Sequence, residues 1–290
     1  MASPTPDSAD KIYEDQFAAS PERLEAFADV VAVVKQLRRD CPWDRAQTHE
    51  SVKHLLIEEA YEVVGAIDER DWGGLPEELG DVFLHVLFHA TIAEEEGRFT
   101  LADVIEAETD KLVRRHPHVF GEVAADDADE VAASWEEIKQ QEKDEDDASV
   151  LDGVPPQLPA LLRAQRVQEK AAGVGFEFPD RDEAWGKVQE ELEEFRETVT
   201  ADEGPERQHE ELGDLLFALV NYARYAGLNP ENALRDGVDS FTDRFQHVER
   251  RLAGRGVSIN EADLAEMRRL WADTNEVDTN GAEARKSTDA

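Results

Sequence analysis

The sequence is poor in cysteine and in basic residues. Its 290 residues include a single cysteine, Cys41, so the chain forms no internal disulfide, which favours a reducing compartment. The 31 Lys and Arg residues stand against 68 Asp and Glu residues, for a formal net charge of −37. Binding to nucleic acid or to an anionic membrane needs a basic surface that displaces counterions. We therefore expect neither as a partner.

Long hydrophobic runs are also missing. The longest apolar stretch, residues 82–93, carries His85 and His89 and is too short to cross a bilayer. Residues 1–10 are polar and acidic and lack the positive and apolar regions of a secretory signal. We therefore expect a cytoplasmic protein. Hydrophobic residues still make up 40% of the chain, which is enough for a folded core.

Strand-like alternation is nearly absent, and apolar residues instead recur with the period of an α-helix. The apolar residues between Val52 and Ile67 fall on one stripe, and Thr48 or Ser51 is the expected N-cap of that helix. The sequence therefore predicts an all-α fold. Further helices are expected over residues 76–95, 101–115, 127–143 and 181–200.

The chain contains an internal repeat. A Glu-x-x-Glu motif and a Glu-Leu-Gly-Asp motif occur at residues 59–62 and 78–81, and again at 191–194 and 211–214. The offsets are 132 (191 − 59) and 133 (211 − 78), so two copies of one helical module are the simplest explanation.

An acidic, proline-containing segment separates the two copies and is typical of a linker. The predicted divisions are a polar N-terminal tail (1–20), a first module (21–143), the linker (144–157), a second module (158–275) and a polar C-terminal tail (276–290).

Each motif places two carboxylates at i and i+3, on one face of a helix, and a short loop makes the two helices antiparallel neighbours. Four clustered carboxylates repel one another, at roughly 4 kcal/mol per pair 4 Å apart. They need raised pKa values, Lys or Arg partners, or a divalent cation, and an all-oxygen site suits Mg²⁺ or Mn²⁺. The first quartet is Glu59, Glu62, Glu78 and Asp81, and the second quartet is Glu191, Glu194, Glu211 and Asp214.

Glycine lies between the last two acids of each quartet, at Gly80 and Gly213. Because glycine weakens a helix, we expect it to permit close helix approach or ligand access. His85 and His89 do not favour zinc, because the second copy has Ala218 and Tyr222 there. A substrate contact or a core histidine is the interpretation that we favour.

Two alternatives remain open at this stage. The first is a carboxylate-bridged di-iron bundle, which usually adds Glu-x-x-His motifs, and the sequence has one at Glu206–His209. The second is a non-catalytic helical interaction protein whose acidic residues only form a solvated face.

Several motifs together resemble the MazG family over about residues 20–275. They are Cys41-Pro-Trp-Asp44 with Gln47-Thr-His49, the first-copy carboxylate motifs, and Asp110-Lys111 through Arg115-His-Pro-His-Val-Phe120. The resemblance implies two all-α repeats and Mg²⁺-dependent hydrolysis of (deoxy)nucleoside triphosphates to the monophosphate and pyrophosphate, by water attack at the α-phosphate. Mn²⁺ is a possible substitute. It also implies a homodimer, in which each repeat completes a helical bundle with the same repeat of a second chain.

The resemblance further implies that both quartets bind metal. Our candidates for catalytic residues are Glu59, Glu62, Glu191 and Glu194, and which glutamate serves as general base stays open. Substrate contacts carried over are Lys111, Arg115 and Arg244 for phosphates, Trp135 and Trp271 for base stacking, and Lys139, which follows Trp135. Ser240 stands where the second repeat should carry a lysine, so which repeat turns over substrate stays open. The base and sugar preferences and the number of metal ions also stay open.

Overall fold

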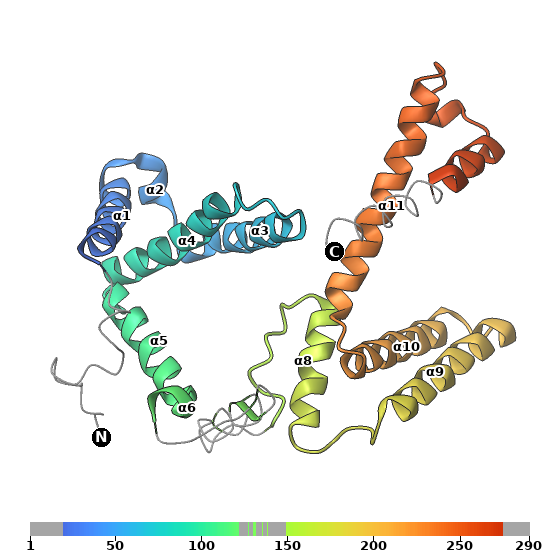
Figure 1. Cartoon of the computed structure of the whole chain (residues 1–290), viewed down its shortest axis with the longest axis horizontal. Helices are drawn as coiled ribbons and strands as arrows, with labels where there is room; N and C mark the ends of the chain where they lie inside the picture. Colours follow the sequence, from blue (N-terminus) through green and yellow to red (C-terminus); the bar gives the residue numbers. More distant parts are fainter. Residues whose placement is uncertain are drawn as a thin grey trace. The chain divides into compact units, whose positions relative to one another are not determined.

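The computed structural model describes residues 20–121, 127, 130–131, 135, 138 and 149–274. It divides the chain into two compact units, Met1–Glu142 and Lys143–Ala290 (Figure 1). Every regular element in the described ranges is helical, with no strand among them, which confirms the all-α fold.

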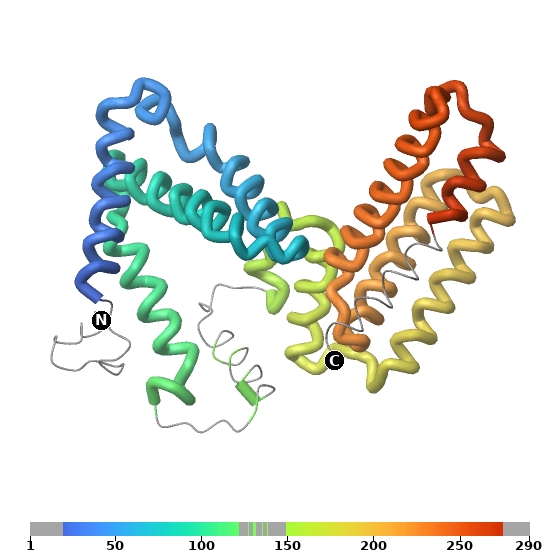
Figure 2. Tube along the Cα trace, turned by 45° about the horizontal axis from the view of Figure 1, so that its top comes forward, coloured from blue at the N-terminus to red at the C-terminus, as the bar shows by residue number. Residues whose placement is uncertain are grey.

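Unit 1 is built around an antiparallel helical hairpin. The hairpin consists of α3 (His49–Asp68) and α4 (Leu75–Glu95), and α1 packs on α4 (Figure 2). Val52, Leu87 and Phe88 belong to the core between these helices. The remaining described elements are α1 (Pro21–Asp40), α2 (Pro42–Ala46), α5 (Leu101–Arg115) and α6 (Pro117–Phe120).

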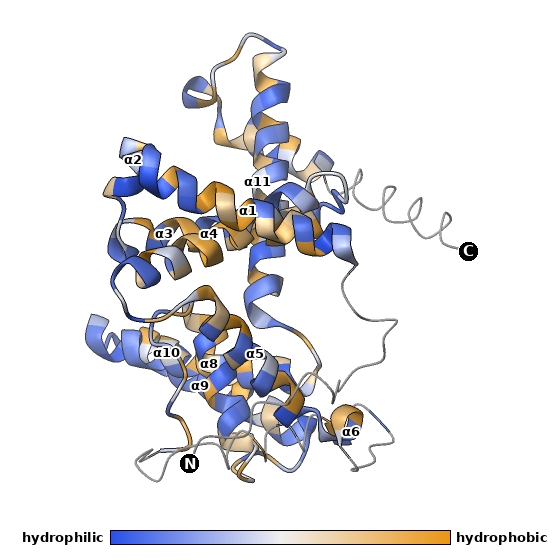
Figure 3. Ribbon diagram, turned by 90° about the vertical axis from the view of Figure 1, so that its left-hand side faces the viewer, coloured by the Kyte–Doolittle hydropathy of each residue, from blue (hydrophilic) through white to orange (hydrophobic). Residues whose placement is uncertain are grey.

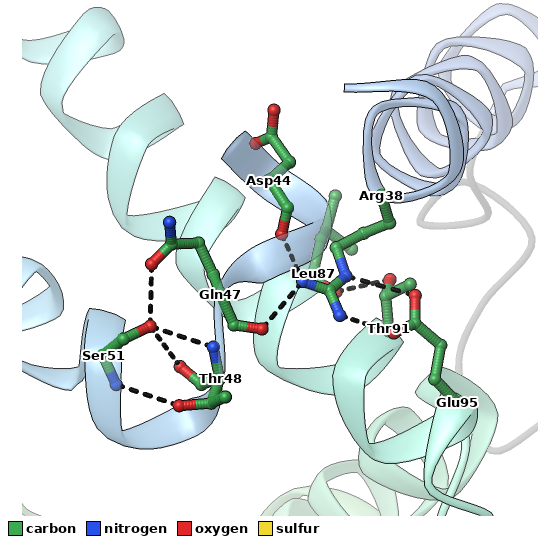
Figure 4. Close-up of polar contacts among 8 residues, drawn as sticks. All are labelled: Arg38, Asp44, Gln47, Thr48, Ser51, Leu87, Thr91 and Glu95. Carbon is green, nitrogen blue, oxygen red and sulfur yellow. Dashed lines mark hydrogen bonds and ion pairs between the residues drawn. The ribbon is translucent and has the colours of Figure 1, made fainter. Parts of the chain in front are cut away.

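A buried arginine fixes the loop that leads into α3. Arg38, only 6% exposed, donates hydrogen bonds to the carbonyl oxygens of Asp44 and Gln47 and pairs with Glu95 through Nη2 at 2.5 Å (Figure 4). One side chain therefore ties α1, the α2 loop and α4 together. This clamp positions the start of the helix that carries the first two predicted metal ligands.

The ends of the unit 1 helices follow the sequence expectations closely. Thr48 caps α3 and accepts a hydrogen bond from the Ser51 backbone, while the Ser51 side chain bonds back to the Thr48 backbone. Both predicted cap residues thus act together as a capping box. Pro76 lies in the first turn of α4, and α5 ends at Arg115, as predicted.

Unit 2 repeats the hairpin with α9 (Arg181–Ala201) and α10 (Pro205–Tyr225). The turn between them uses two left-handed positions, Asp202 with φ 55° and Gly204 with φ 92°. Only glycine adopts the second conformation readily. The other elements are α8 (Ala160–Ala172), which packs on α10 and α11, then α11 (Pro230–Ala253), the 3₁₀ helix η2 (Ile259–Glu261) and a helical segment over 264–274.

The two hairpins carry the two sets of motifs in the same order. The predicted tails and most of the predicted helix over residues 127–143 lie outside the described residues, so the proposed module boundaries stay predictions. Among the described helices, none has the length and apolar character needed to cross a membrane.

Candidate active sites

The structure brings the first quartet together between α3 and α4. Carboxylate oxygens of Glu59, Glu78 and Asp81 lie within 4.8 Å of one another. Glu62 lies on the same side and interacts with both Glu59 and Glu78. The i, i+3 spacing on each helix and the antiparallel packing produce this cluster, as the sequence predicted.

The electrostatics of the first quartet are those of an uncompensated acidic cluster. Burial first, then a hydrogen bond to Glu62 and the charges of Glu62 and Asp81, raise the pKa of Glu59 to about 7. Burial and the neighbouring Glu62 also raise the pKa of Glu78. The cluster therefore competes for positive charge, either a proton or a cation.

Histidines surround the inner end of the first quartet. His85 Nε2 lies 3.9 Å from Glu59 Oε1, and His85 Nδ1 is buried without a hydrogen-bond partner. Desolvation lowers the pKa of His85, so the ring does not supply a permanent positive charge. His49 and His89 stack and share a 2.8 Å hydrogen bond between their Nδ1 atoms. His89 is thus engaged with another side chain, whereas His85 is only partly satisfied.

The second quartet forms between α9 and α10. Oxygens of Glu191, Glu211 and Asp214 lie within 4.8 Å of one another, and Glu194 approaches Glu191 within the same limit. The side chains of Glu191 and Glu211 are 8% and 3% exposed, so these two carboxylates are more deeply buried than that of Glu59, whose side chain is 21% exposed.

Two cations that our sequence analysis missed neutralise part of the second quartet. Lys187 Nζ lies 2.7 Å from Glu191 Oε1 and 2.8 Å from Glu190 Oε1. Arg207 pairs in the same way with Glu211 and Glu210. Each cation stands four residues before its buried partner, a spacing that places the two side chains on one helix face and could have been read from the sequence.

The pKa shifts around the second quartet agree with this pairing. Hydrogen bonds to Glu190 and Glu191 raise the pKa of Lys187, which keeps its ammonium group charged. Burial, together with the charges of Glu191 and Glu211, raises the pKa of Glu194. Glu194 is therefore a better proton acceptor than an ordinary solvent-exposed glutamate.

A pocket of about 800 Å³ opens beside the second quartet. Its polar wall includes Glu191, Asp214 and Lys187, and its apolar wall includes Phe176 and Phe217. This volume is in the range of small-molecule sites, where an apolar lining with a few polar groups is typical.

Two amide side chains add hydrogen-bonding groups to the pocket wall, Gln168 and Asn221. Gln168 is 7% exposed and donates from Nε2 to the carbonyl oxygen of Phe217, at 2.8 Å. Its Oε1 is buried without a partner. A fixed acceptor of this kind suits recognition of a donor group on a ligand.

The predicted phosphate and stacking residues form an Arg–Trp pair in each unit. In unit 1 the Arg115 guanidinium lies 6.0 Å from the centre of the Trp135 ring. Lys111, on the same helix, forms an ion pair with Glu108. Lys139 lies outside the described residues.

In unit 2 the corresponding pair is tighter. The Arg244 guanidinium lies 4.1 Å from the centre of the Trp271 ring, and Arg244 Nε bonds to Thr274 Oγ1 at 2.7 Å. This pair is built on α11 and the segment over 264–274, whereas the second quartet is built on α9 and α10. Ser240 stands on α11 in place of the expected lysine, so that positive charge is missing from this helix. Lys187 on α9 and Arg207 on α10 supply two positive charges instead.

The glycines of the two Leu-Gly steps do not bring helices into close contact within the chain. A Cβ atom at Gly80 or at Gly213 would meet no atom within 4 Å. Of the two roles predicted for these glycines, close approach within the chain is therefore wrong. Access for a ligand remains a prediction.

Both quartets suit a divalent cation. Their donors are all carboxylate oxygens, which prefer hard ions. In the second quartet, Glu211 Oε2 is also buried without a partner, which is costly unless a cation or a donor satisfies it.

Comparisons with known proteins agree with these motifs. Residues 47–120 match the family model described as the MazG nucleotide pyrophosphohydrolase domain. A relative from Thermotoga maritima, named nucleoside triphosphate pyrophosphohydrolase/pyrophosphatase MazG, is 42% identical over 247 residues, which cover 84% of this chain and 94% of the relative. The chain belongs to the MazG family.

A second MazG-type relative extends this result. A nucleoside triphosphate pyrophosphohydrolase from Escherichia coli is 42% identical over 251 residues, which cover 86% of this chain and 95% of the relative. A crystal structure of a mazG-related protein from Thermotoga maritima is 27% identical, with a TM-score of 0.36, and covers 39% of this chain and 98% of that one.

Proposed function

We propose that this chain is a nucleoside triphosphate pyrophosphohydrolase that releases the nucleoside monophosphate and pyrophosphate, with Mg²⁺ as its metal and the second quartet as its active site. Membership of the MazG family and the names of two relatives that align over nearly their whole length support the reaction class. Mn²⁺ would satisfy the same oxygen ligands.

The observation that carries the choice of site is the combination of groups around the pocket. Glu191, Asp214 and Lys187 line the pocket together with the aromatic rings of Phe176 and Phe217. Arg207 does not line the pocket, but it pairs with Glu211, whose carboxylate clusters with those of Glu191 and Asp214. The carboxylates suit the metal, Lys187 and Arg207 suit phosphate oxygens, and the aromatic wall suits the nucleoside. The sequence did not decide which of the two repeats is active, because Ser240 stands where a lysine is expected in the second repeat.

In this mechanism Glu191, Glu211 and Asp214 would hold the metal, which when bound would neutralise the triphosphate and lower the pKa of the attacking water. Glu194 accepts a proton from that water as its oxygen attacks the α-phosphorus. The bond between the α-phosphorus and the bridging oxygen breaks, and pyrophosphate leaves. Lys187 and Arg207 stabilise negative charge on the phosphate oxygens during this step.

We further propose that the active protein is a homodimer. Each hairpin exposes large apolar side chains that its own unit does not cover. Figure 3 shows hydrophobic residues, coloured orange, along these helices. Contiguous exposed apolar patches mark interaction surfaces. In α3 and α4 they are Ile57, Tyr61, Leu79, Phe83 and Val86, and in α9 and α10 they are Leu192, Val199, Leu212, Leu216 and Leu219.

Product analysis with Mg²⁺ and a mixture of nucleoside triphosphates tests the function directly. We expect monophosphate and pyrophosphate in equal amounts. Diphosphate with orthophosphate would mean that the bond between the β- and γ-phosphates is attacked, and no turnover with either Mg²⁺ or Mn²⁺ would favour a non-catalytic interaction protein.

The di-iron alternative gains nothing from the structure. Glu206 and His209 lie at the exposed start of α10, and neither belongs to a metal-competent cluster among the described residues. A visible absorbance band after loading with iron and exposure to oxygen would restore this alternative.

A further inference from the structure

The two hairpins carry the same acidic motifs. They differ in the residue that stands four positions before the first acid of each motif. In unit 2, Lys187 precedes Glu191 and Arg207 precedes Glu211, and both pairs are in contact. Subtracting the repeat offsets of 132 and 133 gives the unit 1 positions, which are Leu55 and Gly74. The first hairpin therefore has no cation at either place.

This difference changes the charge that an incoming cation meets. Each hairpin has six acidic residues here, because a glutamate precedes the first acid of each motif in both copies. In unit 2 the extra glutamates, Glu190 and Glu210, share the same two cations. The formal charge of the group is thus −6 in unit 1 and −6 + 2 = −4 in unit 2.

The two cations also occupy the oxygens that a metal ion would use. Lys187 Nζ lies 2.7 Å from Oε1 of Glu191, and Arg207 contacts Oε1 of Glu211. The second oxygen of Glu211 is buried and has no partner. One buried oxygen of the cluster is therefore left for a ligand, while Oε1 of Glu191 and Oε1 of Glu211 already have cationic partners.

Both cationic side chains have room to leave. The Lys187 side chain is 37% exposed and the Arg207 side chain is 49% exposed, and Lys187 lines the pocket beside Asp214. Both groups are long, flexible and suited to phosphate oxygens. A triphosphate in the pocket would lie next to Lys187, which lines it. Arg207 lies one residue further out, on Glu211, whose carboxylate clusters with those of the lining residues Glu191 and Asp214, so a triphosphate bound at that cluster would come within its reach.

We propose that Lys187 and Arg207 are displaceable counterions, which weaken binding of a free divalent cation to the second quartet and transfer to the phosphates when metal and triphosphate arrive together. The second quartet then binds metal strongly only with a triphosphate, whereas the first quartet binds metal alone. This inference rests on the proposed function only in taking a triphosphate as the ligand. By linkage, metal and triphosphate strengthen each other's binding at this site by the same factor.

The test is Mn²⁺ binding to the full chain, measured by electron paramagnetic resonance in a Glu59→Gln/Glu78→Gln background that weakens the first quartet. We expect a non-hydrolysable α,β-methylene triphosphate to tighten Mn²⁺ binding at least about tenfold. Adding Lys187→Met and Arg207→Met should strengthen binding of Mn²⁺ alone by a similar factor and abolish the effect of the analogue.

Arg196→Met is the matched control, because Arg196 forms an exposed ion pair with Glu193 on the same helix and should leave both measurements unchanged. Unchanged Mn²⁺ affinity in the Lys187→Met/Arg207→Met variant would overturn the inference. The single variants, Lys187→Met and Arg207→Met, provide the same readout if the double variant does not fold.

Inorganic tripolyphosphate separates this inference from the proposed function. If it tightens Mn²⁺ binding through Lys187 and Arg207 although no nucleotide is hydrolysed, the inference stands and the proposed function fails. If nucleotides are hydrolysed to pyrophosphate but neither tripolyphosphate nor the analogue changes Mn²⁺ affinity, the function stands and the inference is wrong.

Discussion

The two helical hairpins hold the same carboxylates but balance their charge in different ways. In the first, burial and the neighbouring Glu62 raise the pKa of Glu59 to about 7, and His85 lies beside that carboxylate. In the second, Lys187 and Arg207 pair with the two most buried acids. The acidic motifs determine where the candidate metal ligands lie. The residues one helical turn before them determine the net charge of the cluster.

The two units are more alike in the residues predicted to contact phosphate and base. The Arg–Trp pairs, Arg115 with Trp135 and Arg244 with Trp271, stand in both units at distances of 6.0 and 4.1 Å from ring centre to guanidinium. The repeats therefore share the Arg–Trp pair, although Ser240 replaces the lysine on its helix in unit 2, and they differ at the acidic cluster by the two added cations.

The largest difference between the repeats is expected in turnover. Glu191→Gln should lower kcat/KM at least about a hundredfold, a loss typical of removing one group that stabilises charge in the transition state. Glu59→Gln should change kcat/KM by less than about threefold, because we place the chemistry in unit 2. Initial rates of pyrophosphate release from the purified variants measure both values.

Similar losses in both variants would mean that both repeats are active or that they act together. A large loss only in Glu59→Gln would place the active site in unit 1. Circular dichroism of each variant serves as the control for folding.

The next effect concerns stability and should be confined to unit 1. Arg38→Met removes hydrogen bonds to two backbone carbonyl oxygens and an ion pair to Glu95. We expect a loss of about 2–4 kcal/mol in the free energy of unfolding, because two half-buried carbonyl groups lose their donor and Glu95 loses its ionic partner. Chemical denaturation followed by tryptophan fluorescence measures it.

Arg39→Met is the control for the Arg38 variant, because Arg39 is exposed and forms its ion pair with the adjacent residue, Asp40. Equal stability of both variants would show that the α2 loop does not depend on the clamp.

The pH dependence of metal binding should separate the two quartets further. A raised pKa means that folded Glu59 keeps a proton between its ordinary value of 4.5 and about 7, whereas the unfolded chain has lost it. In that window the group's contribution to stability falls as pH rises. Since a metal ion displaces that proton, Mn²⁺ affinity at the first quartet should rise about tenfold per pH unit up to about 7 and then level off.

Titrations in a Glu191→Gln/Glu211→Gln background isolate the first quartet. A flat profile between pH 5 and pH 7, roughly the window in which the shifted carboxyl titrates, would contradict the assigned shift. The second quartet, measured in the Glu59→Gln/Glu78→Gln background, should show a shallower slope because two permanent cations already compensate its charge.

The smallest predicted effect is on base selectivity. If the unpartnered Oε1 of Gln168 accepts a hydrogen bond from the base, Gln168→Met should change the preference between amino-bearing and keto bases by about three- to tenfold. Rates with ATP, CTP, ITP and UTP measure it. Gln165→Met is the control, since its Oε1 is also buried without a partner but Gln165 is not among the residues lining the pocket.

Much of this molecule follows from local sequence patterns. The helical period, the Thr48–Ser51 cap and the end of α5 at Arg115 are short-range features, decided within one or two turns. The spacing of the acidic motifs and the short connecting loops suffice to assemble both quartets. Even the pairs Lys187–Glu191 and Arg207–Glu211, which we missed, obey an i, i+4 rule that the sequence displays.

Other features depend on contacts between residues far apart in the chain, and only the tertiary structure decides them. Arg38 meets Glu95 across 57 positions, His49 meets His89 across 40, and Gln168 meets Phe217 across 49. Helical periodicity states which face of a helix is buried, but the neighbour that covers this face depends on how the helices pack. The pocket beside the second quartet, and the unpartnered Oε1 of Gln168, a residue that lines it, arise from that packing and have no local signature.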